Sequence, residues 1–142
     1  MTDSVLVAMD DSPLGREALA VALETFPDAR VTVVHVAFPD FDMLPEDTEE
    51  AFGASLDELD DVGDETAASV FETVREVADG RDVAVTFLTG EPERRIAEYA
   101  DEGEFDHVVL GTHGRSGLSR ALIGSVAEAV TRETAVPTTL VK

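Results

Sequence analysis

The sequence contains no cysteine, and this absence excludes several kinds of chemistry. Disulfide bonds, thiolate-bound metals, iron–sulfur clusters and thiol catalysis all need that side chain. No apolar run reaches the roughly 18–20 residues that a membrane-spanning helix needs, and no basic segment followed by an apolar one opens the chain as in a signal peptide. We therefore expect a cytoplasmic protein, and its 142 residues predict a single domain over residues 1–142.

Lysine is almost absent as well, while acidic residues are abundant. Asp and Glu number 31 against ten Lys and Arg, Lys142 is the only lysine, and the net charge is −21. Nucleic acids and anionic membranes attract basic surfaces, so this composition argues against both as partners. An acid-rich, lysine-poor composition is typical of proteins from salt-loving organisms, because concentrated salt screens the repulsion among like charges. We expect a salt-rich cytoplasm; the alternative is an ordinary acidic protein, which would keep its fold when KCl is diluted.

Short apolar runs alternate with segments of helical pattern along the chain. The runs predict five buried strands, at residues 5–9, 31–38, 82–88, 105–110 and 138–141. Helices are expected from Pro13 to the Pro27-Asp28 pair, across about residues 48–79, from Pro92 to Gly103 and over residues 126–133. Such alternation predicts an α/β, doubly wound fold, with a parallel sheet, helices on both faces and right-handed crossovers.

Two loops at the carboxyl ends of the predicted strands carry the candidate chemistry, because ligands of open parallel sheets bind at that edge. The first loop, Asp10-Asp11-Ser12, follows the first strand. The second spans residues 111–125 and contains four glycines, which let backbone N–H groups approach an anion closely. It has neither the Gly-Lys-Ser/Thr of a Walker A motif nor the G-x-G-x-x-G of dinucleotide-binding folds.

The second loop has the charge and the helix start expected of a phosphate site. No acidic residue occurs from position 107 to position 127, and Arg115 and Arg120 lie in that window as candidate phosphate contacts. Ser125 and Glu128 predict a capping box, so the positive end of the following helix would face the glycines. The pattern indicates a phosphate site, with a turn whose glycines serve only the backbone as the alternative.

The spacing of the loop glycines is similar to a known nucleotide-binding signature. Gly111-x2-Gly114-x9-Gly124-Ser125 resembles the G-x2-G-x9-G-[S/T] signature of the universal stress protein family, in its ATP-binding subgroup. Residues 5–12 resemble the first strand and acidic turn of that family, and residues 136–141 resemble its last strand. The resemblance implies a Rossmann-like fold of the adenine nucleotide alpha hydrolase type, with a five-stranded parallel sheet in the order 3-2-1-4-5. It also implies a homodimer joined through the last strand, residues 138–141.

The resemblance further implies which residues meet the nucleotide. Asp10 would lie at the nucleoside end, and backbone around Val36 would meet adenine. Mg²⁺ or Mn²⁺ would be carried on the phosphates of ATP rather than in a protein cage. One departure from the family's pattern is Asp11, a second acid directly after Asp10. Ribose and phosphates would be held by Gly111, Gly114, Gly124 and Ser125, and the pocket would be lined by Ala8, Leu110 and Val126.

The remaining motifs favour no separate active site. A receiver domain would need a phosphorylatable Asp after the third strand, where Thr89-Gly90 stands. His35 and His107 fall in predicted strands, where a hydrogen-bonded structural role is expected, and their spacing fits no zinc motif. His113 is expected to shape the glycine loop.

We therefore expect an ATP-binding, Mg²⁺-dependent regulatory or sensing module of the stress response; the pattern does not distinguish ATP from AMP. No general base and no lysine lies beside the phosphates, so turnover is expected to be slow or absent. Two alternatives stay open. One is an autokinase or slow ATPase that uses Asp10, Arg115 and the metal, and the other is a nucleotide-independent dimerisation module.

Overall fold

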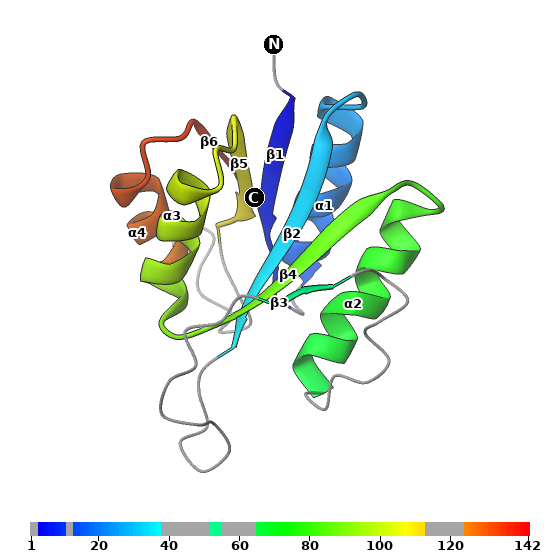
Figure 1. The fold of residues 1–142 in the computed structure, drawn as a ribbon, viewed down its shortest axis with the longest axis horizontal. Coiled ribbons are helices and arrows are strands. Elements are labelled where there is room, and N and C mark those ends of the chain that lie inside the picture. Colours follow the sequence, from blue (N-terminus) through cyan, green and yellow to red (C-terminus); the bar gives the residue numbers. More distant parts are fainter. Residues whose placement is uncertain (1–2, 11–12, 38–51, 55–64, 113–123) are drawn as a thin grey trace.

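The computed structural model describes residues 3–10, 13–37, 52–54, 65–112 and 124–142 (Figure 1). Within these ranges the chain alternates between strands and helices, as the sequence pattern predicts. The elements are β1 (Ser4–Ala8), α1 (Pro13–Thr25), β2 (Arg30–Ala37), β3 (Phe52–Ala54), α2 (Glu65–Ala78), β4 (Val83–Thr89), α3 (Pro92–Glu102), β5 (His107–Gly111), α4 (Ser125–Glu133) and β6 (Thr138–Val141).

The sheet confirms the expected order of strands. Its strands lie in the order β3-β4-β2-β1-β5-β6, and β4, β2, β1, β5 and β6 run parallel. These five are the strands predicted from the sequence, so their order reads 3-2-1-4-5. The order reverses at β1, which is the position where open parallel sheets bind ligands.

The prediction of one helix across about residues 48–79 is wrong over residues 52–54. There the chain forms β3, which pairs antiparallel with β4 through Phe52↔Phe87 and Ala54↔Val85, and α2 begins at Glu65. Gly53 disfavours a helix, and strand pairing gives the backbone groups of this segment partners along the edge of β4. Residues 48–51 and 55–64 lie outside the described residues.

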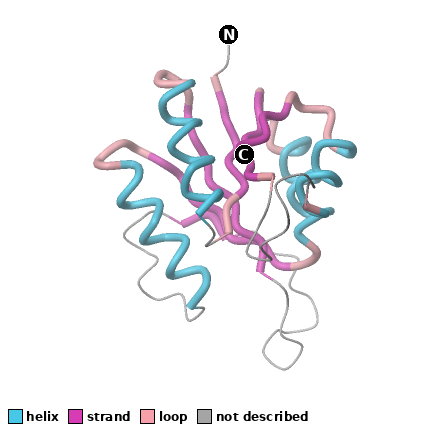
Figure 2. Tube along the Cα trace, turned by 180° about the vertical axis from the view of Figure 1, so that it is seen from behind, coloured by secondary structure: helices cyan, strands magenta, loops and turns pink. Residues whose placement is uncertain are grey.

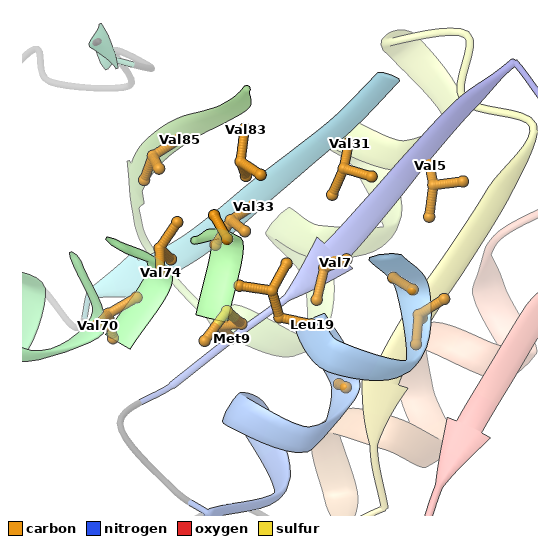
Figure 3. Close-up of a cluster of buried hydrophobic side chains, with 14 of the residues drawn as sticks. Val5, Val7, Met9, Leu19, Val31, Val33, Val70, Val74, Val83 and Val85 are labelled. Atoms are coloured by element: carbon orange, nitrogen blue, oxygen red, sulfur yellow. The ribbon is translucent and has the colours of Figure 1, made fainter. Parts of the chain in front are cut away.

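Two described helices cover each face of the sheet. α1 and α2 pack on one face, and α3 and α4 pack on the other (Figures 1 and 2). Successive strand residues point to opposite faces, so Val5 and Val7 pack with α1 and α2, whereas Leu6 and Ala8 face α3 and α4. Figure 3 shows the first of these clusters, in which valines of β1, β2 and β4 face Leu19 of α1 and Val70 and Val74 of α2. Cover on both faces explains why the strands are continuous apolar runs.

The boundaries of α3 follow the sequence signals. The helix has Pro92 in its first turn, where the missing N–H costs nothing. It stops before Gly103, whose N–H donates to the Tyr99 carbonyl oxygen at 2.9 Å. None of the described helices is long and apolar enough to span a membrane.

The predicted capping box at the start of α4 is wrong. Gly124 is the N-cap, Ser125 is the first helical residue, and no side chain caps the helix. The reason is a tertiary bond: the Gly124 N–H donates to the Thr112 carbonyl oxygen at 2.7 Å, which fixes the point at which the chain enters the helix.

Side chains fasten the chain at the amino ends of the parallel strands. Asp106, directly before β5, accepts the backbone N–H groups of Asp3 and Ser4, both at 3.0 Å. Arg81, shortly before β4, donates to three backbone carbonyl oxygens at 2.8, 3.0 and 3.2 Å, those of Leu23, Phe26 and Ala29. These bonds tie the start of β1 to the segment before β5, and the end of α1 to the segment before β4.

Candidate functional site

A pocket of about 220 Å³ lies at the carboxyl ends of β1, β2 and β5, next to the first turns of α1, α3 and α4. Gly114 and the candidate phosphate contacts Arg115 and Arg120 lie outside the described residues. The structure brings together all the described residues that the resemblance assigned to a site, although their roles toward a ligand stay predictions. These residues are Ala8, Asp10, Val36, Leu110, Gly111, Gly124, Ser125 and Val126.

One wall of the pocket is apolar and tightly packed. Ala8, Val36, Ile96 and Leu110 are each at most 8% exposed and belong to the core cluster that packs with α3 and α4. Apolar area on a ligand would be removed from water against this wall. It can therefore hold an aromatic ring such as a nucleobase.

Another side of the pocket is the start of α4. The first N–H that donates within this helix is that of Glu128, which reaches the Gly124 carbonyl oxygen at 3.0 Å. Ser125, Val126 and Ala127 line the pocket and form the first turn of α4, where backbone N–H groups have no acceptor inside the helix itself. The helix dipole adds a partial positive charge at the same end. This side of the pocket can bind an anion such as phosphate.

Backbone hydrogen bonds hold the start of α4 in place beside the sheet. Thr112 is 4% exposed, and its N–H donates to the Val141 carbonyl oxygen at 2.9 Å. Its own carbonyl oxygen accepts the Gly124 N–H. The last strand, the turn after β5 and the N-cap of α4 are thus joined by two consecutive bonds.

Asp10 is the one carboxylate among the described lining residues, and it packs against Gly15 of α1. A Cβ atom at Gly15 would lie 2.7 Å from the Asp10 carbonyl oxygen and 3.2 Å from its Oδ1. Only glycine therefore lets α1 approach Asp10 this closely. Sequence reasoning missed Gly15, although a glycine in the first turn of a predicted helix was the available signal.

The two histidines predicted to be structural are hydrogen bonded as expected. His107 Nε2 lies 2.6 Å from Thr139 Oγ1, and burial lowers the pKa of His107. His35 is 5% exposed, and its Nδ1 lies 2.9 Å from the Met9 carbonyl oxygen. Unlike His107, His35 also lines the pocket, which the sequence interpretation did not anticipate. His113 lies outside the described residues.

Sequence reasoning also missed lining residues next to the predicted ones and on α3. Met9, Thr112 and Ala127 adjoin predicted site residues in the sequence, so adjacency was a usable signal. Pro92 and Ile96 come from α3, and nothing in the spacing indicates that this helix lines the pocket.

Within the described residues, no group of three or more His, Cys, Asp or Glu side chains could hold a metal ion. Asp10 alone offers a carboxylate to the pocket from its described lining. Mg²⁺ usually keeps several waters and binds through one or two carboxylates together with substrate phosphates. The described lining therefore fits a metal that arrives on a phosphate.

Comparisons with known proteins agree with this fold. The model of the universal stress protein family matches residues 1–142. A universal stress protein of Methanocaldococcus jannaschii is 30% identical over 143 residues, which cover 97% of this chain and 81% of the relative.

Two solved structures are similar over nearly the whole chain. A universal stress protein in complex with cAMP has a TM-score of 0.69 at 24% identity, covering 99% of this chain and 97% of that one. The universal stress protein from Archaeoglobus fulgidus in complex with dAMP has a TM-score of 0.63 at 22% identity, covering 100% of this chain and 98% of that one. At these identities the likeness establishes the fold.

Proposed function

Because this chain belongs to the universal stress protein family, we propose that its pocket binds an adenine nucleotide and acts as a regulatory or sensing module in the stress response. The preferred ligand is ATP with Mg²⁺ or Mn²⁺ on its phosphates. The observation that carries this proposal is that the pocket is lined on one side by apolar core residues and on another by the first residues of α4.

Each part of the ligand has a matching part of the pocket. The base lies against Ala8, Val36 and Leu110, where its apolar faces leave water. The phosphates receive hydrogen bonds from the amides at the start of α4. Asp10 accepts a hydrogen bond from the nucleoside end. The cAMP and dAMP complexes of related proteins support an adenine nucleotide as the ligand class.

The same residues favour binding without turnover. The described lining has no lysine, and Asp10 is its one carboxylate. A bound divalent metal supplies charge neutralisation to the phosphates, and the backbone amides orient them. Because the described lining offers no carboxylate base other than Asp10 to an attacking hydroxyl or water, we expect transfer of the terminal phosphoryl group to be slow or absent.

The proposal also includes the oligomeric state of the protein and its location in the cell. β6 ends the order of the described strands, and a second copy joins through its outer side to form a homodimer. The excess of acidic residues suits a cytoplasm rich in salt, where the repulsion among them is screened.

Calorimetric titration with ATP and Mg²⁺ tests the proposed function, on protein purified in molar KCl and freed of any co-purified nucleotide. We expect binding with a dissociation constant in the micromolar range. GTP with Mg²⁺ serves as the matched control, because it carries the same phosphates on a different base. Absence of ATP binding in protein that is folded by circular dichroism would favour the nucleotide-independent dimerisation module.

Turnover is measured on the same sample with γ-labelled ATP. Label on the protein would indicate an autokinase, and release of inorganic phosphate would indicate an ATPase. We expect neither above the rate of the blank.

A further inference from the structure

A buried histidine at the end of β2 reaches across to the chain that follows β1. His35 is 5% exposed, and its Nδ1 lies 2.9 Å from the carbonyl oxygen of Met9. A carbonyl oxygen can only accept, so the ring nitrogen at this contact carries the hydrogen. The imidazole ring is held from the side by Phe87 of β4, with ring centroids 6.1 Å apart and planes at 79°.

The bond from His35 is the last of three restraints on Met9. The Met9 N–H donates to the Val34 carbonyl oxygen at 2.9 Å, one residue beyond the β1–β2 ladder. The Met9 side chain is 4% exposed and points into the core cluster beside Leu19 (Figure 3). With its N–H, its carbonyl oxygen and its side chain all engaged, Met9 has a fixed orientation at the point where β1 ends.

The residue that follows this fixed point is Asp10, which lines the pocket. Its other side is limited by α1, because a Cβ atom at Gly15 would lie 2.7 Å from the Asp10 carbonyl oxygen and 3.2 Å from Oδ1. Asp10 therefore sits between a restrained Met9 and the backbone of α1. A small rotation of the Met9 peptide would move the Asp10 carboxylate within the pocket.

We propose that His35 is a positioning residue, which sets the direction of the Asp10 carboxylate in the pocket through its hydrogen bond to the Met9 carbonyl oxygen. This positioning role adds a residue to the proposed nucleotide site. It rests on the proposed function only where it concerns nucleotide affinity. The hydrogen bond and its effect on the free protein can be tested without any ligand.

The first test is the tautomer of the His35 ring in the free protein, measured at pH 8. Nitrogen-15 NMR distinguishes a ring that carries hydrogen on Nδ1 from one that carries it on Nε2. We expect the Nδ1–H form for His35, because only this form can donate to Met9. A ring with hydrogen on Nε2 alone would overturn the proposal.

The second test compares two amide substitutions that place the donor at different distances from the backbone. In His35→Asn the amide lies near the position of Nδ1, and in His35→Gln it lies near the position of Nε2. Amide hydrogen exchange at Met9 and Asp10 should stay at the wild-type rate in the Asn variant and rise in the Gln variant. Equal exchange in the two variants would show that His35 only fills space.

The third test measures ATP affinity in the presence of Mg²⁺. His35→Gln should weaken binding about tenfold, and His35→Asn should restore it to within about twofold of wild type. If His35 acts through Asp10, the His35→Gln change costs less than about twofold in an Asp10→Ala background. If the loss of ATP affinity caused by His35→Gln simply adds to the loss caused by Asp10→Ala, the proposal would be overturned.

The tests separate this proposal from the proposed function. If folded wild-type protein binds no nucleotide, the proposed function fails, and the ring protonation and exchange rates decide the role of His35. If ATP binds and the Asn and Gln variants behave alike, the proposed function stands and the positioning role fails.

Discussion

The two ends of the parallel sheet are built in different ways. At the amino ends, charged side chains fasten the chain, with Arg81 bonded to three carbonyl oxygens and Asp106 to two N–H groups. At the carboxyl ends, a backbone bond holds the chain at Gly124, the lack of a side chain at Gly15 lets α1 approach Asp10, and His35 adds one side-chain bond to the Met9 carbonyl oxygen. The pocket lies at that second end.

This difference indicates that the residues that stabilise the fold are separate from those that bind the ligand. Side chains that secure the amino ends lie far from the pocket lining and can contribute to folding alone. The carboxyl end leaves space and backbone donors for a ligand, because small residues stand where larger ones would fill the cavity. Substitutions at the two ends should therefore change different measurements.

The largest effect is expected for Gly124→Val at the carboxyl end. A valine side chain at this pocket-lining position would occupy space needed by the phosphates, so ATP affinity should fall at least about a hundredfold, or ~2.7 kcal/mol. The Gly124 backbone, with φ −64° and ψ 157°, is open to any residue, so the fold should survive. Calorimetry measures the affinity, and thermal unfolding measures the stability.

The matched control for Gly124→Val is Gly103→Val at the amino end. A Cβ atom there would collide with the Phe105 ring and lie 2.9 Å from the Tyr99 carbonyl oxygen, so the melting temperature should fall. Affinity per folded molecule should stay unchanged. If Gly103→Val weakened binding as strongly as Gly124→Val, the separation of the two ends would be refuted.

The next largest effect is expected for Arg81→Met. The apolar side chain keeps much of the volume but removes three hydrogen bonds to backbone carbonyl oxygens, so the free energy of unfolding should fall by about 2 kcal/mol. Chemical denaturation measures this change, and calorimetry should give unaltered ATP affinity. Arg132→Met is the control, because its ion pair with Glu128 at 3.5 Å is exposed and should contribute less than about 0.5 kcal/mol.

A smaller loss is expected for Asp106→Ala. The Asp3 and Ser4 amides would lose their acceptor but could bond to water, since this contact is exposed, so the free energy of unfolding should fall by about 1 kcal/mol. Asp106→Asn keeps an acceptor oxygen and should lose less. Equal losses in the two variants would mean that the charge, rather than the two hydrogen bonds, stabilises the start of β1.

The smallest effect concerns pH and His107. Burial lowers the pKa of His107 in the folded protein, so the unfolded chain takes up a proton first as the pH falls below its ordinary value of about 6.5. The stability that depends on neutral His107 is present above that pH and is lost as the pH falls toward the lower pKa of the folded state. His107→Gln keeps a polar group near Thr139 but does not titrate.

The measurement is the difference in unfolding free energy between wild type and His107→Gln, taken from pH 8 to pH 5. Taking the difference removes the effect of the many carboxylates, which are the same in both proteins. The difference should fall with decreasing pH, at less than the ~1.4 kcal/mol per pH unit that a whole proton would give. A difference that is flat or rises would contradict the expected sign.

Most of the parallel sheet could be predicted because its signals are local. Strand β6 spans the residues after Pro137 that the sequence predicts, and α3 runs from Pro92 to the residue before Gly103. Each boundary is marked by a residue within the segment or directly next to it. The strand order came from the resemblance in glycine spacing, since apolar runs alone do not specify neighbours.

The sequence predictions were wrong where contact with a distant segment determines the local structure. β3 is a strand because the edge of β4 pairs with it, and its three residues carry no strand pattern of their own. Gly124 caps α4 because Thr112 accepts its N–H, which overrides the preference of Ser125 for the N-cap. The contribution of Ile96 to the pocket likewise follows from the packing of α3 on the sheet.

The short antiparallel strand β3 also affects how readily the sheet could aggregate. An uncovered edge strand exposes a row of N–H and C=O groups to which another chain can add, and β4, with the sequence VAVTFLT, is an apolar seven-residue segment suited to such growth. β3 pairs with Val85, Thr86 and Phe87 in the middle of that edge. Within the described residues, a strand arriving from another molecule would meet the three residues of β3 at this edge. The fold thereby shields one of its most fibre-prone segments with its own backbone.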